Sequence, residues 1–477
     1  MTQRRGSVLV GLLWCLTLLS VVVIGVLHLA RLDLKVTQNY ADTIQARYLA
    51  LAGVEKAKAL LYRDMMERQR AVKSHSGELH SLPEQFRDVR LGRGEFSVFR
   101  QGRRDEGGGI LYGVSDEESR LNVNHASSQE LSKILGMTED VLAAIQDWRD
   151  GDNSARPSGA EAEHYASLRP PYLPRNGPFQ TMRELLMVRG VTRELLSGED
   201  ANQNGLLDPE EDDGRASLPV DDADGVLDSG WSELLTIDSM ARNENSAGQA
   251  RVDIKSADER TLSSVRGISE ELAKAIVAYR NQDEFETIAD LLDVRAMVPQ
   301  SPGAVEENSR RPPGGGPQSG ARSGTPLPQQ QSRQRSSEAQ PNLQPTGPPL
   351  INEDLLIEIA DDITTGSDTE QPGAININTA SPEVLACLPG VSRELGQAIV
   401  AYRKSAGYFP NIAAVLKVDG MTRDIFKQLA PKICARSETF RILSEGRVPL
   451  TGARRRVEMV VRVSSGNVET LSYREDL

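Results

Sequence analysis

The chain has 477 residues, with 55 Lys and Arg against 68 Asp and Glu, and a formal net charge of −13 at pH 7. This length excludes one ordinary domain, and three cysteines, Cys15, Cys387 and Cys434, exclude a disulfide framework. Residues 199–228 hold eleven acids and one base, so they contribute ten of the thirteen excess negative charges. The rest of the chain is close to neutral. A pairing of Cys387 with Cys434 stays open beside the alternative of two buried free thiols.

The N-terminal region is long enough and apolar enough to cross a membrane. Residues 8–30 carry no formal charge, and about 23 residues span roughly 35 Å as a helix. Arg4 and Arg5 precede this span and few basic residues follow it directly, which predicts a cytoplasmic N-terminus and a periplasmic chain after Arg31. We therefore expect residues 7–30 to be the single transmembrane helix of an inner-membrane protein.

The apolar span continues into residues 31–70 without a small-x-small cleavage site, which argues against a secretory signal. Apolar and aromatic residues recur there at spacings of three and four, the pattern of one amphipathic helix face. We therefore expect the membrane helix to continue into the periplasm. The predicted face consists of Leu32, Val36, Tyr40, Ile44, Tyr48, Leu51, Val54 and Leu61.

One helix that begins in a bilayer and continues into a soluble domain resembles the type IV pilins and pseudopilins. The resemblance implies that residues 1–6 are a leader, that prepilin peptidase cuts after Gly6, and that Ser7 becomes the N-terminus. Most members carry glutamate as the fifth residue after the cut, where this chain has Gly11. A carboxylate in the bilayer costs about 2.5 to 3.5 kcal/mol on insertion scales, so it is tolerated mainly when a neighbour's terminal amine pairs with it. The missing glutamate favours a subunit at the tip, with nothing above it.

Strands are predicted on both sides of a helical region. In residues 90–118, alternating residues around Val98 lead through a triple-glycine turn into the run ILYGV, which indicates a hairpin. In residues 438–477, alternation from Val457 to Val463 leads through Ser465-Gly466-Asn467 into a last strand. We expect an α+β fold: a long N-terminal transmembrane and amphipathic helix packed on a small antiparallel sheet, with a large all-α insertion.

Three stretches of the chain resemble one another and resemble helix-hairpin-helix units. Each begins with N-x-N or D-x-K, continues through a polar cap and a short helix, and turns at a glycine into a second helix. They are residues 121–150, 252–294 and 374–434, the first two within a helical insertion predicted over residues 119–298. Residues 299–350 are rich in Pro, Gly, Ser, Gln and Arg, which predicts a disordered linker.

Helix-hairpin-helix units often bind DNA, so a membrane-anchored periplasmic DNA receptor of the competence type is the alternative function. DNA-binding members hold a phosphate with the backbone N–H groups of a G-x-G hairpin, whereas the turns at Gly136, Gly267, Gly390 and Gly420 lack the second glycine. Residues 252–294 carry ten acids against five bases, which opposes phosphate binding. We expect a structural or protein-contact role and no nucleic acid, although the mildly basic third unit keeps the alternative open.

The acidic stretch matches the calcium-loop pattern D-x-[DN]-x-[DN]-G-x5-E in full. Hard oxygen ligands at alternate positions can curl round Ca²⁺ because the glycine permits a sharp bend, and without a cation the carboxylates would repel one another. The sequence therefore predicts a calcium site, with a solvated acidic loop as the alternative. The predicted ligands are the side chains of Asp200, Asn202, Asn204 and Glu211, the carbonyl of Leu206, and Asp208 acting through water.

A second, incomplete calcium loop follows within the same acidic stretch. Its candidate ligands are Asp222, Asp224, Val226 and Asp228, with Gly225 in register. Val220 and Trp231 occupy its first and last ligand positions, so this loop is the weaker of the two.

No catalytic motif is recognisable in the sequence, so we expect no enzyme. The histidines stand alone, without the spacings of a zinc site, a nucleophile elbow or a phosphate-binding loop, and isolated histidines are more often surface or core residues. They are His28, His75, His80, His125 and His164.

Taken together, the pilin-like start without its glutamate, the segment SDEESRLNVNHAS from Ser115, the segment from Asp147 to Asp200 and the last helical repeat resemble the K-type minor pseudopilins of type II (general) secretion systems. The resemblance implies a tip subunit that assembles with the I-type and J-type minor pseudopilins and the major pseudopilin, and that binds calcium. Within it, the acids Asp147, Asp150 and Asp152 are either a family-like feature or a solvated turn.

Overall fold

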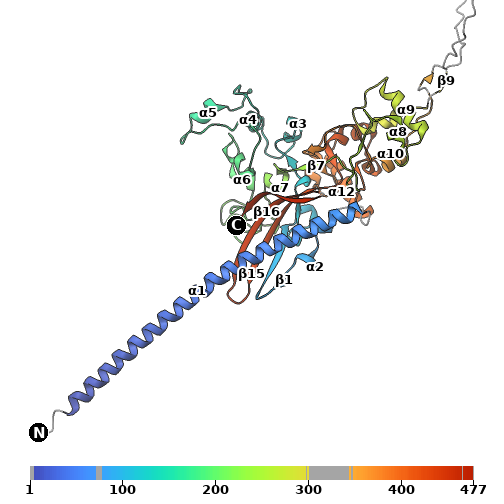
Figure 1. The fold of residues 1–477 in the computed structure, drawn as a ribbon. Coiled ribbons are helices and arrows are strands. Elements are labelled where there is room, and N and C mark those ends of the chain that lie inside the picture. Colours follow the sequence, from blue (N-terminus) through green and yellow to red (C-terminus); the bar gives the residue numbers. More distant parts are fainter. Residues whose placement is uncertain are drawn as a thin grey trace, which may run out of the picture.

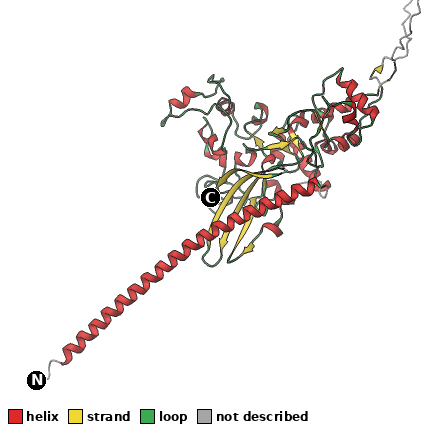
Figure 2. Cartoon of the chain, viewed as in Figure 1, coloured by secondary structure: helices red, strands yellow, loops and turns green. Residues whose placement is uncertain are grey.

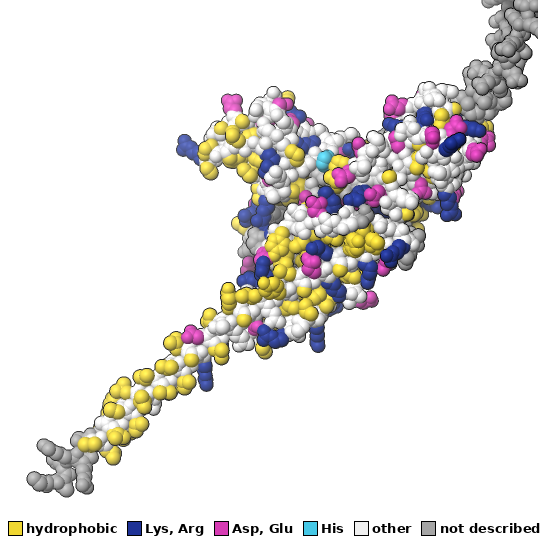
Figure 3. All heavy atoms as spheres, viewed as in Figure 1, with side chains coloured by type: hydrophobic (Ala, Val, Ile, Leu, Met, Phe, Trp, Pro, Cys, Tyr) yellow, Lys and Arg dark blue, Asp and Glu magenta, His cyan; other side chains and the backbone are white. Residues whose placement is uncertain are grey.

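The structure is a computed structural model that describes residues 5–70, 78–296, 298–299, 343–344, 347–464 and 466–475. Its first helix, α1 (Arg5–Gln69), is unbroken and projects far beyond the rest of the molecule (Figure 1). By length and composition α1 can cross a membrane, and apolar side chains cover its projecting part (Figure 3). The prediction of one helix that continues from the apolar span into residues 31–70 is confirmed.

The second half of α1 packs on an antiparallel sheet (Figure 2). The sheet reaches the helix at Asp42, whose carboxylate accepts a hydrogen bond from Thr451 Oγ1 at 3.0 Å. From there buried residues such as Ala46, Ala50 and Val54 recur at spacings of four, as on one helix face. The predicted face is therefore right only from Leu51 onward: Leu51 is half-buried and Val54 and Leu61 are buried. The earlier members are exposed, including two that lie beyond Asp42; they are Leu32, Val36, Tyr40, Ile44 and Tyr48.

The sheet has the order β1-β2-β15-β16-β17 and joins residues from both ends of the chain. β15 pairs with β2 and, along its whole length, with β16, while β3 pairs with β2 and β4 with the start of β15. The predicted hairpins, β2 with β3 and β16 with β17, are both present, and the α+β class is confirmed. The strands are β1 (Val89–Leu91), β2 (Gly94–Gln101), β3 (Ile110–Leu111), β4 (Ser115–Asp116), β15 (Thr439–Val448), β16 (Ala453–Ser464) and β17 (Asn467–Arg474).

The helical region consists of three units, each closed by a two-residue parallel strand pair between its start and its end. The first is closed by β5 (Leu121–Asn122) and β6 (Leu235–Thr236). The second is closed by β8 (Val252–Asp253) and β11 (Ile363–Thr364), and the third by β13 (Ile375–Asn376) and β14 (Ile433–Cys434). An antiparallel pair, β7 (Met240–Arg242) with β12 (Glu370–Pro372), connects the end of the first unit to the start of the third.

Each unit contains short α-helices joined by hairpins and 3-10 helices. The first holds α3 (Ser128–Leu131), α4 (Glu139–Arg149), α5 (Ala162–Ala166), η4 (Met182–Met187), α6 (Arg193–Ser197) and α7 (Trp231–Leu234); the second holds α8 (Glu259–Ser263), α9 (Glu270–Arg280), η5 (Ile288–Asp293) and α10 (Glu353–Ile359); the third holds α11 (Pro382–Cys387), α12 (Arg393–Ala406), η6 (Ile412–Lys417) and α13 (Arg423–Leu429). Outside the units lie η1 (Glu78–His80), α2 (Pro83–Phe86), η2 (Arg104–Glu106) and η3 (Glu117–Ser119). In the third unit η7 (Ala430–Lys432) follows α13, and β9 (Val298–Pro299) and β10 (Leu343–Gln344) lie between η5 and α10 of the second.

An arginine in the second helix of each unit ties that helix to the unit's first turn. Arg149, Arg280 and Arg403 donate to main-chain carbonyls of that turn at 2.9, 2.6 and 2.9 Å. Each arginine follows an aromatic residue whose ring packs against a phenylalanine further along the chain. These ring pairs are Trp148–Phe179, Tyr279–Phe285 and Tyr402–Phe409.

The Pro-rich segment interrupts the middle unit at the tip of its second hairpin. Leu350 N donates to the carbonyl of Val294 at 2.9 Å, as Met421 N donates to that of Val418 at 3.0 Å in the third unit. The hairpin therefore closes across the insertion, and the middle unit extends to α10. Of the predicted linker 299–350, residues 300–342 and 345–346 lie outside the described residues.

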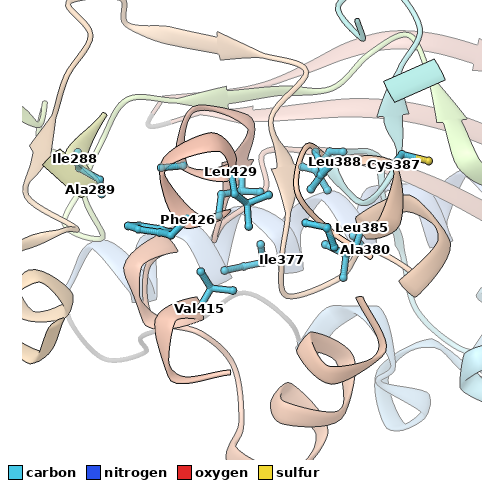
Figure 4. Packing of buried hydrophobic residues seen from close by; sticks show 14 of the residues in the cluster. Ile288, Ala289, Ile377, Ala380, Leu385, Cys387, Leu388, Val415, Phe426 and Leu429 are labelled. Atoms are coloured by element: carbon cyan, nitrogen blue, oxygen red, sulfur yellow. The ribbon is translucent and has the colours of Figure 1, made fainter. Parts of the chain in front are cut away.

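The largest buried hydrophobic cluster runs through all three units. Figure 4 shows its part around Ile377, Leu385, Val415 and Phe426, where helices of the third unit meet. Cys387 lies in this cluster, Cys434 is buried in a smaller one, and both thiols are free. Since neither thiol is bonded, the structure agrees with the interpretation of two buried free cysteines.

Candidate metal centre and helical hairpins

The predicted calcium loop follows α6 in the first unit. Gln203 and Gly205 have left-handed φ angles of 57° and 71°, which bend the chain back on itself. Within this bend, Asp200 Oδ1 and Asn202 Oδ1 accept from the same donor, Asn204 N, at 3.0 and 2.9 Å. The other oxygen of Asp200 accepts from Gly205 N at 3.0 Å. The first two predicted ligands therefore turn toward the inside of the loop.

The remaining carboxylates complete the inside of the loop. Asp208 Oδ2 accepts from the side-chain amides of Asn202 and Asn204 at 2.8 and 2.7 Å. Glu211 reaches back to accept from Ala201 N at 2.9 Å and from Asp208 N at 3.2 Å. The five predicted side-chain ligands thus lie together, as the sequence pattern requires.

The two acids at the ends of the pattern are shielded from solvent. Asp200 is 6% exposed and Glu211 is 3% exposed. Burial raises the pKa of both carboxyl groups, although backbone N–H donors oppose the shift. Carboxylate and amide oxygens in one bend are the donor set of a hard divalent cation such as Ca²⁺, so the residues present fit such an ion.

The loop is anchored to the sheet by its own apolar residue. Leu206, whose carbonyl is a predicted ligand, packs in a buried cluster with Phe99 of β2 and Leu443 of β15. The conformation of the loop is therefore coupled to the outer face of the sheet that supports α1.

The weaker second loop is arranged differently from the first. Asp222 and Asp224 face the guanidinium of Arg104, with N···O distances of 3.4 and 2.6 Å. Asp228 Oδ1 accepts from Gly230 N at 2.8 Å, and the side chain of Val226 lies against Gly108. An arginine therefore already pairs with two of its four candidate ligands.

The sequence interpretation missed several acids that organise this second loop. Glu199 accepts from Asp222 N at 3.4 Å and from Asp228 N at 3.1 Å. Asp221 accepts from Gly214 N at 2.7 Å and from Asp213 N at 3.1 Å, and Asp212 from Gly225 N at 3.0 Å. These acids do not follow the alternate-position pattern of a calcium loop. Only the high number of acids in residues 199–228 could have indicated them.

The hairpin glycines face neighbouring helices of their own units. All four predicted glycines have positive φ. A Cβ at Gly136 would lie 2.6 Å from Leu195 of α6, and one at Gly267 would lie 2.8 Å from Ile359 of α10. In the third unit the nearest apolar neighbours are Ile425 for Gly390, at 3.4 Å, and Leu395 for Gly420, at 3.8 Å. These turns therefore pack against protein.

A fifth hairpin, which the sequence interpretation missed, has its turn at Gly190. Its φ is 83°, and a Cβ there would lie 2.8 Å from Val141 of α4. In the first unit the glycine of the first hairpin thus packs on α6, and the glycine of the second hairpin packs on α4. The signal in the sequence is VRGVT, which matches VDGMT at the second hairpin of the third unit.

A buried acidic trio joins the sheet to the helical units. Asp116 Oδ2 accepts from Asn376 Nδ2 at 3.1 Å and from Ser437 Oγ at 2.6 Å. Glu117 pairs with Arg441 at 2.8 Å, and Glu118 accepts from Thr439 N at 3.1 Å. Because these partners come from the third unit and from β15, the segment SDEES links the third unit to the sheet.

The processing residues lie at the start of α1. Gly6 and Ser7 fall in its first turn, and Met1–Arg4 lie outside the described residues. A Cβ at Gly11 would meet nothing within 4 Å, so the structure offers no steric reason for glycine there.

Comparisons with known proteins place the similarity in the helical units. A family described as "Type II secretion system (T2SS), protein K" matches residues 111–198. A family described as "Helix-hairpin-helix motif" matches residues 248–302 and 371–434, which are parts of the second and third units.

Two curated relatives have the same description. The chain is 27% identical over 210 residues to Type II secretion system protein K of Pseudomonas aeruginosa, covering 39% of this chain and 59% of that protein. It is 27% identical over 206 residues to the protein of the same description from Klebsiella pneumoniae, covering 40% of this chain and 60% of that protein. The chain thus matches about three fifths of the length of these relatives.

One solved structure is similar over most of the chain. It is titled as the crystal structure of the GspK-GspI-GspJ complex from the enterotoxigenic Escherichia coli Type 2 Secretion System. The match has a TM-score of 0.39 and 12% identity, and it covers 94% of this chain and 98% of the other.

Proposed function

We propose that this chain, a relative of type II secretion system protein K that carries helix-hairpin-helix motifs, acts as a non-enzymatic minor pseudopilin. The observation that carries the proposal is the combination of one apolar helix, α1, that packs on a small sheet, with a first helical unit that matches protein K. In this role the chain supports export of proteins across the outer membrane from the tip of a periplasmic pseudopilus.

The membrane placement in this proposal follows from α1. Its apolar part forms a single anchor in the inner membrane, with a cytoplasmic N-terminus and a periplasmic soluble region. Prepilin peptidase would cut after Gly6. Gly11 then leaves the anchor without the buried carboxylate that pairs with a subunit above, as suits a subunit at the tip.

The partners in this proposal are other pseudopilins, and a co-isolation experiment tests it. The full chain, produced with I-type, J-type and major pseudopilins and extracted in detergent, should begin at Ser7 by mass and should co-isolate with the small subunits. The Gly11→Glu variant should assemble less well, because it places an unpaired carboxylate in the bilayer. A chain that keeps Met1 and isolates alone contradicts the pseudopilin role, and unchanged assembly of Gly11→Glu contradicts the tip position.

The DNA-receptor alternative is tested in the same preparation. Four hairpin glycines have close apolar neighbours, within 3.4 Å at Gly136, Gly190, Gly267 and Gly390, which supports protein packing over phosphate binding. Duplex DNA should therefore bind weakly or not at all at physiological salt. Salt-sensitive submicromolar binding without pseudopilin partners would favour the receptor.

We further propose that the loop from Asp200 to Glu211 binds calcium. Asp200 and Glu211 are buried in one bend. The amides of Asn202 and Asn204 can present oxygen to a cation after a half-turn of each side chain. The ion would be held by the side chains of Asp200, Asn202, Asn204 and Glu211, by the carbonyl of Leu206, and by Asp208. It would neutralise the loop and fix Leu206 against the sheet.

Removing calcium is expected to lower the melting temperature of the full chain in detergent. An ion at about one hundred times its Kd stabilises by about 2.7 kcal/mol. About 2 to 4 °C accompany each kcal/mol in a cooperative unit of about 150 to 250 residues, the size of the first unit with the sheet and helix beneath its loop, so the expected drop is about 5 to 10 °C. Glu211→Gln should reduce the calcium-dependent rise in Tm, and the exposed neighbour Glu210→Gln should keep it. Equal responses in both variants would remove this loop as the site.

A further inference from the structure

A second group of acids lies in the loop between α4 and α5, apart from the loop discussed above. Asp150, Asp152 and Glu161 each offer one carboxylate oxygen, and these oxygens all lie within 4.8 Å of one another. Calcium binds oxygens at 2.3 to 2.6 Å, so two ligands on opposite sides of one ion are about 5 Å apart. The three carboxylates are therefore close enough to meet a single ion as they stand.

Glu161 is the unusual member of this group. It is 5% exposed, and neither of its carboxylate oxygens has a hydrogen-bond partner. Burying a carboxylate without a donor is costly, and structures normally avoid it. Burial raises the pKa of Glu161, and the carboxylates of Asp147, Asp150 and Asp152 raise it further, while the backbone N–H of Ala162 only partly opposes the shift. The carboxylate of Glu161 thus faces other carboxylates, and no basic side chain in the described part of the chain pairs with it.

The loop is held in this shape by the buried Asp147. This carboxylate accepts from Arg156 N at 3.2 Å and from Arg156 Nη1 at 2.7 Å. Gly159 passes so close that a Cβ there would overlap the Asp147 carboxylate, and its carbonyl accepts from Arg189 Nη1 at 2.9 Å. The backbone that leads to Glu161 is therefore held by the contacts of Asp147 and Gly159.

Arg156 is the basic group that reaches the acidic group itself. Its Nη1 bridges Asp147 and one oxygen of Asp150. Asp152 Oδ1 accepts from Ser154 N at 2.7 Å, which orients it at the turn. Arg156 therefore offsets the negative charge of Asp150, whereas the carboxylate of Glu161 remains without a hydrogen bond.

We propose that Asp150, Asp152 and Glu161 form a separate site for a divalent cation of the calcium class. The donor set is entirely carboxylate oxygen, which suits a hard cation and disfavours zinc, whose protein ligands are mostly thiolate and imidazole. Main-chain oxygens of the loop and water would complete the six to eight ligands of calcium. This site is independent of the proposed role in secretion and of the loop from Asp200 to Glu211.

The test counts calcium ions bound to the full chain in detergent by equilibrium dialysis with ⁴⁵Ca²⁺ alone as the probe. Glu161→Gln should lose one ion per chain, both in the wild-type background and together with Glu211→Gln. Glu163→Gln, a carboxylate two residues away and exposed, should keep the wild-type number. Asp152→Asn, at an exposed position, should repeat the loss and provides the result if Glu161→Gln fails to fold.

Two outcomes would overturn the site. One is a folded Glu161→Gln or Asp152→Asn protein that binds as many ions as the wild type. The other is a loss of one ion in Glu163→Gln as well, since a general decrease in negative charge would then explain the result. Because Glu211→Gln is measured alongside, failure of this site is distinguishable from failure of the first.

Discussion

Replacing Gly446 with valine is expected to separate α1 from the sheet and to lower the melting temperature of the full chain by about 6 to 12 °C. Gly446 lies in β15 where the helix crosses it, and a Cβ there would be 2.0 Å from the carbonyl oxygen of Ala46 and 2.5 Å from Ala50 N. These are backbone atoms, so the helix as a whole must move outward. Overpacking of this kind costs about 3 kcal/mol, and about 2 to 4 °C accompany each kcal/mol.

The crossing is close because glycine occurs on both elements. A Cβ added to Gly53 of α1 would lie 2.2 Å from Ser444 Oγ, and a Cβ added to Gly94 of β2 would lie 2.3 Å from Leu49 Cδ1. Thermal unfolding followed by circular dichroism measures the effect. Gly366→Ala is the matched control, because a Cβ there meets nothing within 4 Å. A Tm of Gly446→Val within 1 °C of the wild type would show that the helix does not depend on this crossing.

The sequence was sufficient to predict the long helix, both hairpins and the α+β class, because each has a local signal. Apolar continuity predicts the helix, and alternation around a turn such as Ser465-Gly466-Asn467 predicts a hairpin. The pairing of β2 with β15 has no such signal, since more than 330 residues separate Phe99 from Leu443 and only tertiary packing selects the partner strand. For the same reason the predicted helix face was wrong before Leu51: periodicity predicts a face, and the position of the sheet decides which residues are covered, here Ala46 and Ala50 rather than Ile44 and Tyr48.

The candidate sites differ in how far they could be predicted. The loop from Asp200 to Glu211 follows a contiguous pattern, and the structure brings its side chains together. For the second group, the sequence interpretation named Asp147, Asp150 and Asp152 as a family-like acidic feature or a solvated turn. It did not include Glu161, which joins Asp150 and Asp152 only through the fold of the loop around Asp147. The middle unit was cut short in the sequence interpretation because its second hairpin is interrupted between Val294 and Leu350.

Glu117→Gln is expected to destabilise the junction between the sheet and the helical units by about 3 kcal/mol. Glu117 is fully buried and pairs with Arg441 at 2.8 Å and with Arg120 at 3.0 Å. Burial alone would raise its pKa, but the two arginines lower it to about 2. A neutral amide leaves both guanidinium groups without this buried counter-charge, and breaking a buried pair from one side costs about 3 to 5 kcal/mol.

The pH dependence gives this prediction its sign. The folded pKa of Glu117 is below the ordinary value of 4.5, so its stabilising contribution is present above about pH 4.5 and is lost as the pH falls toward 2. The Tm difference between wild type and Glu117→Gln should therefore be constant from pH 5 to 7 and should shrink below pH 4.5. Thermal unfolding in detergent at each pH measures it, and a difference that grows on acidification contradicts the assignment of the charge to Glu117.

The adjacent Glu118 provides the matched control because its pKa moves the other way. Burial, and then the neighbouring Asp116, raise the pKa of Glu118 well above its ordinary value, so its contribution to stability is present at low pH and is lost as the pH rises. Glutamine resembles the protonated acid and can still accept from Thr439 N and Met240 N. Glu118→Gln should therefore leave the Tm unchanged or raise it at pH 7. If Glu118→Gln lowers the Tm as much as Glu117→Gln does, loss of any buried acid in SDEES has the same effect, and the ion pair with Arg441 has no special role.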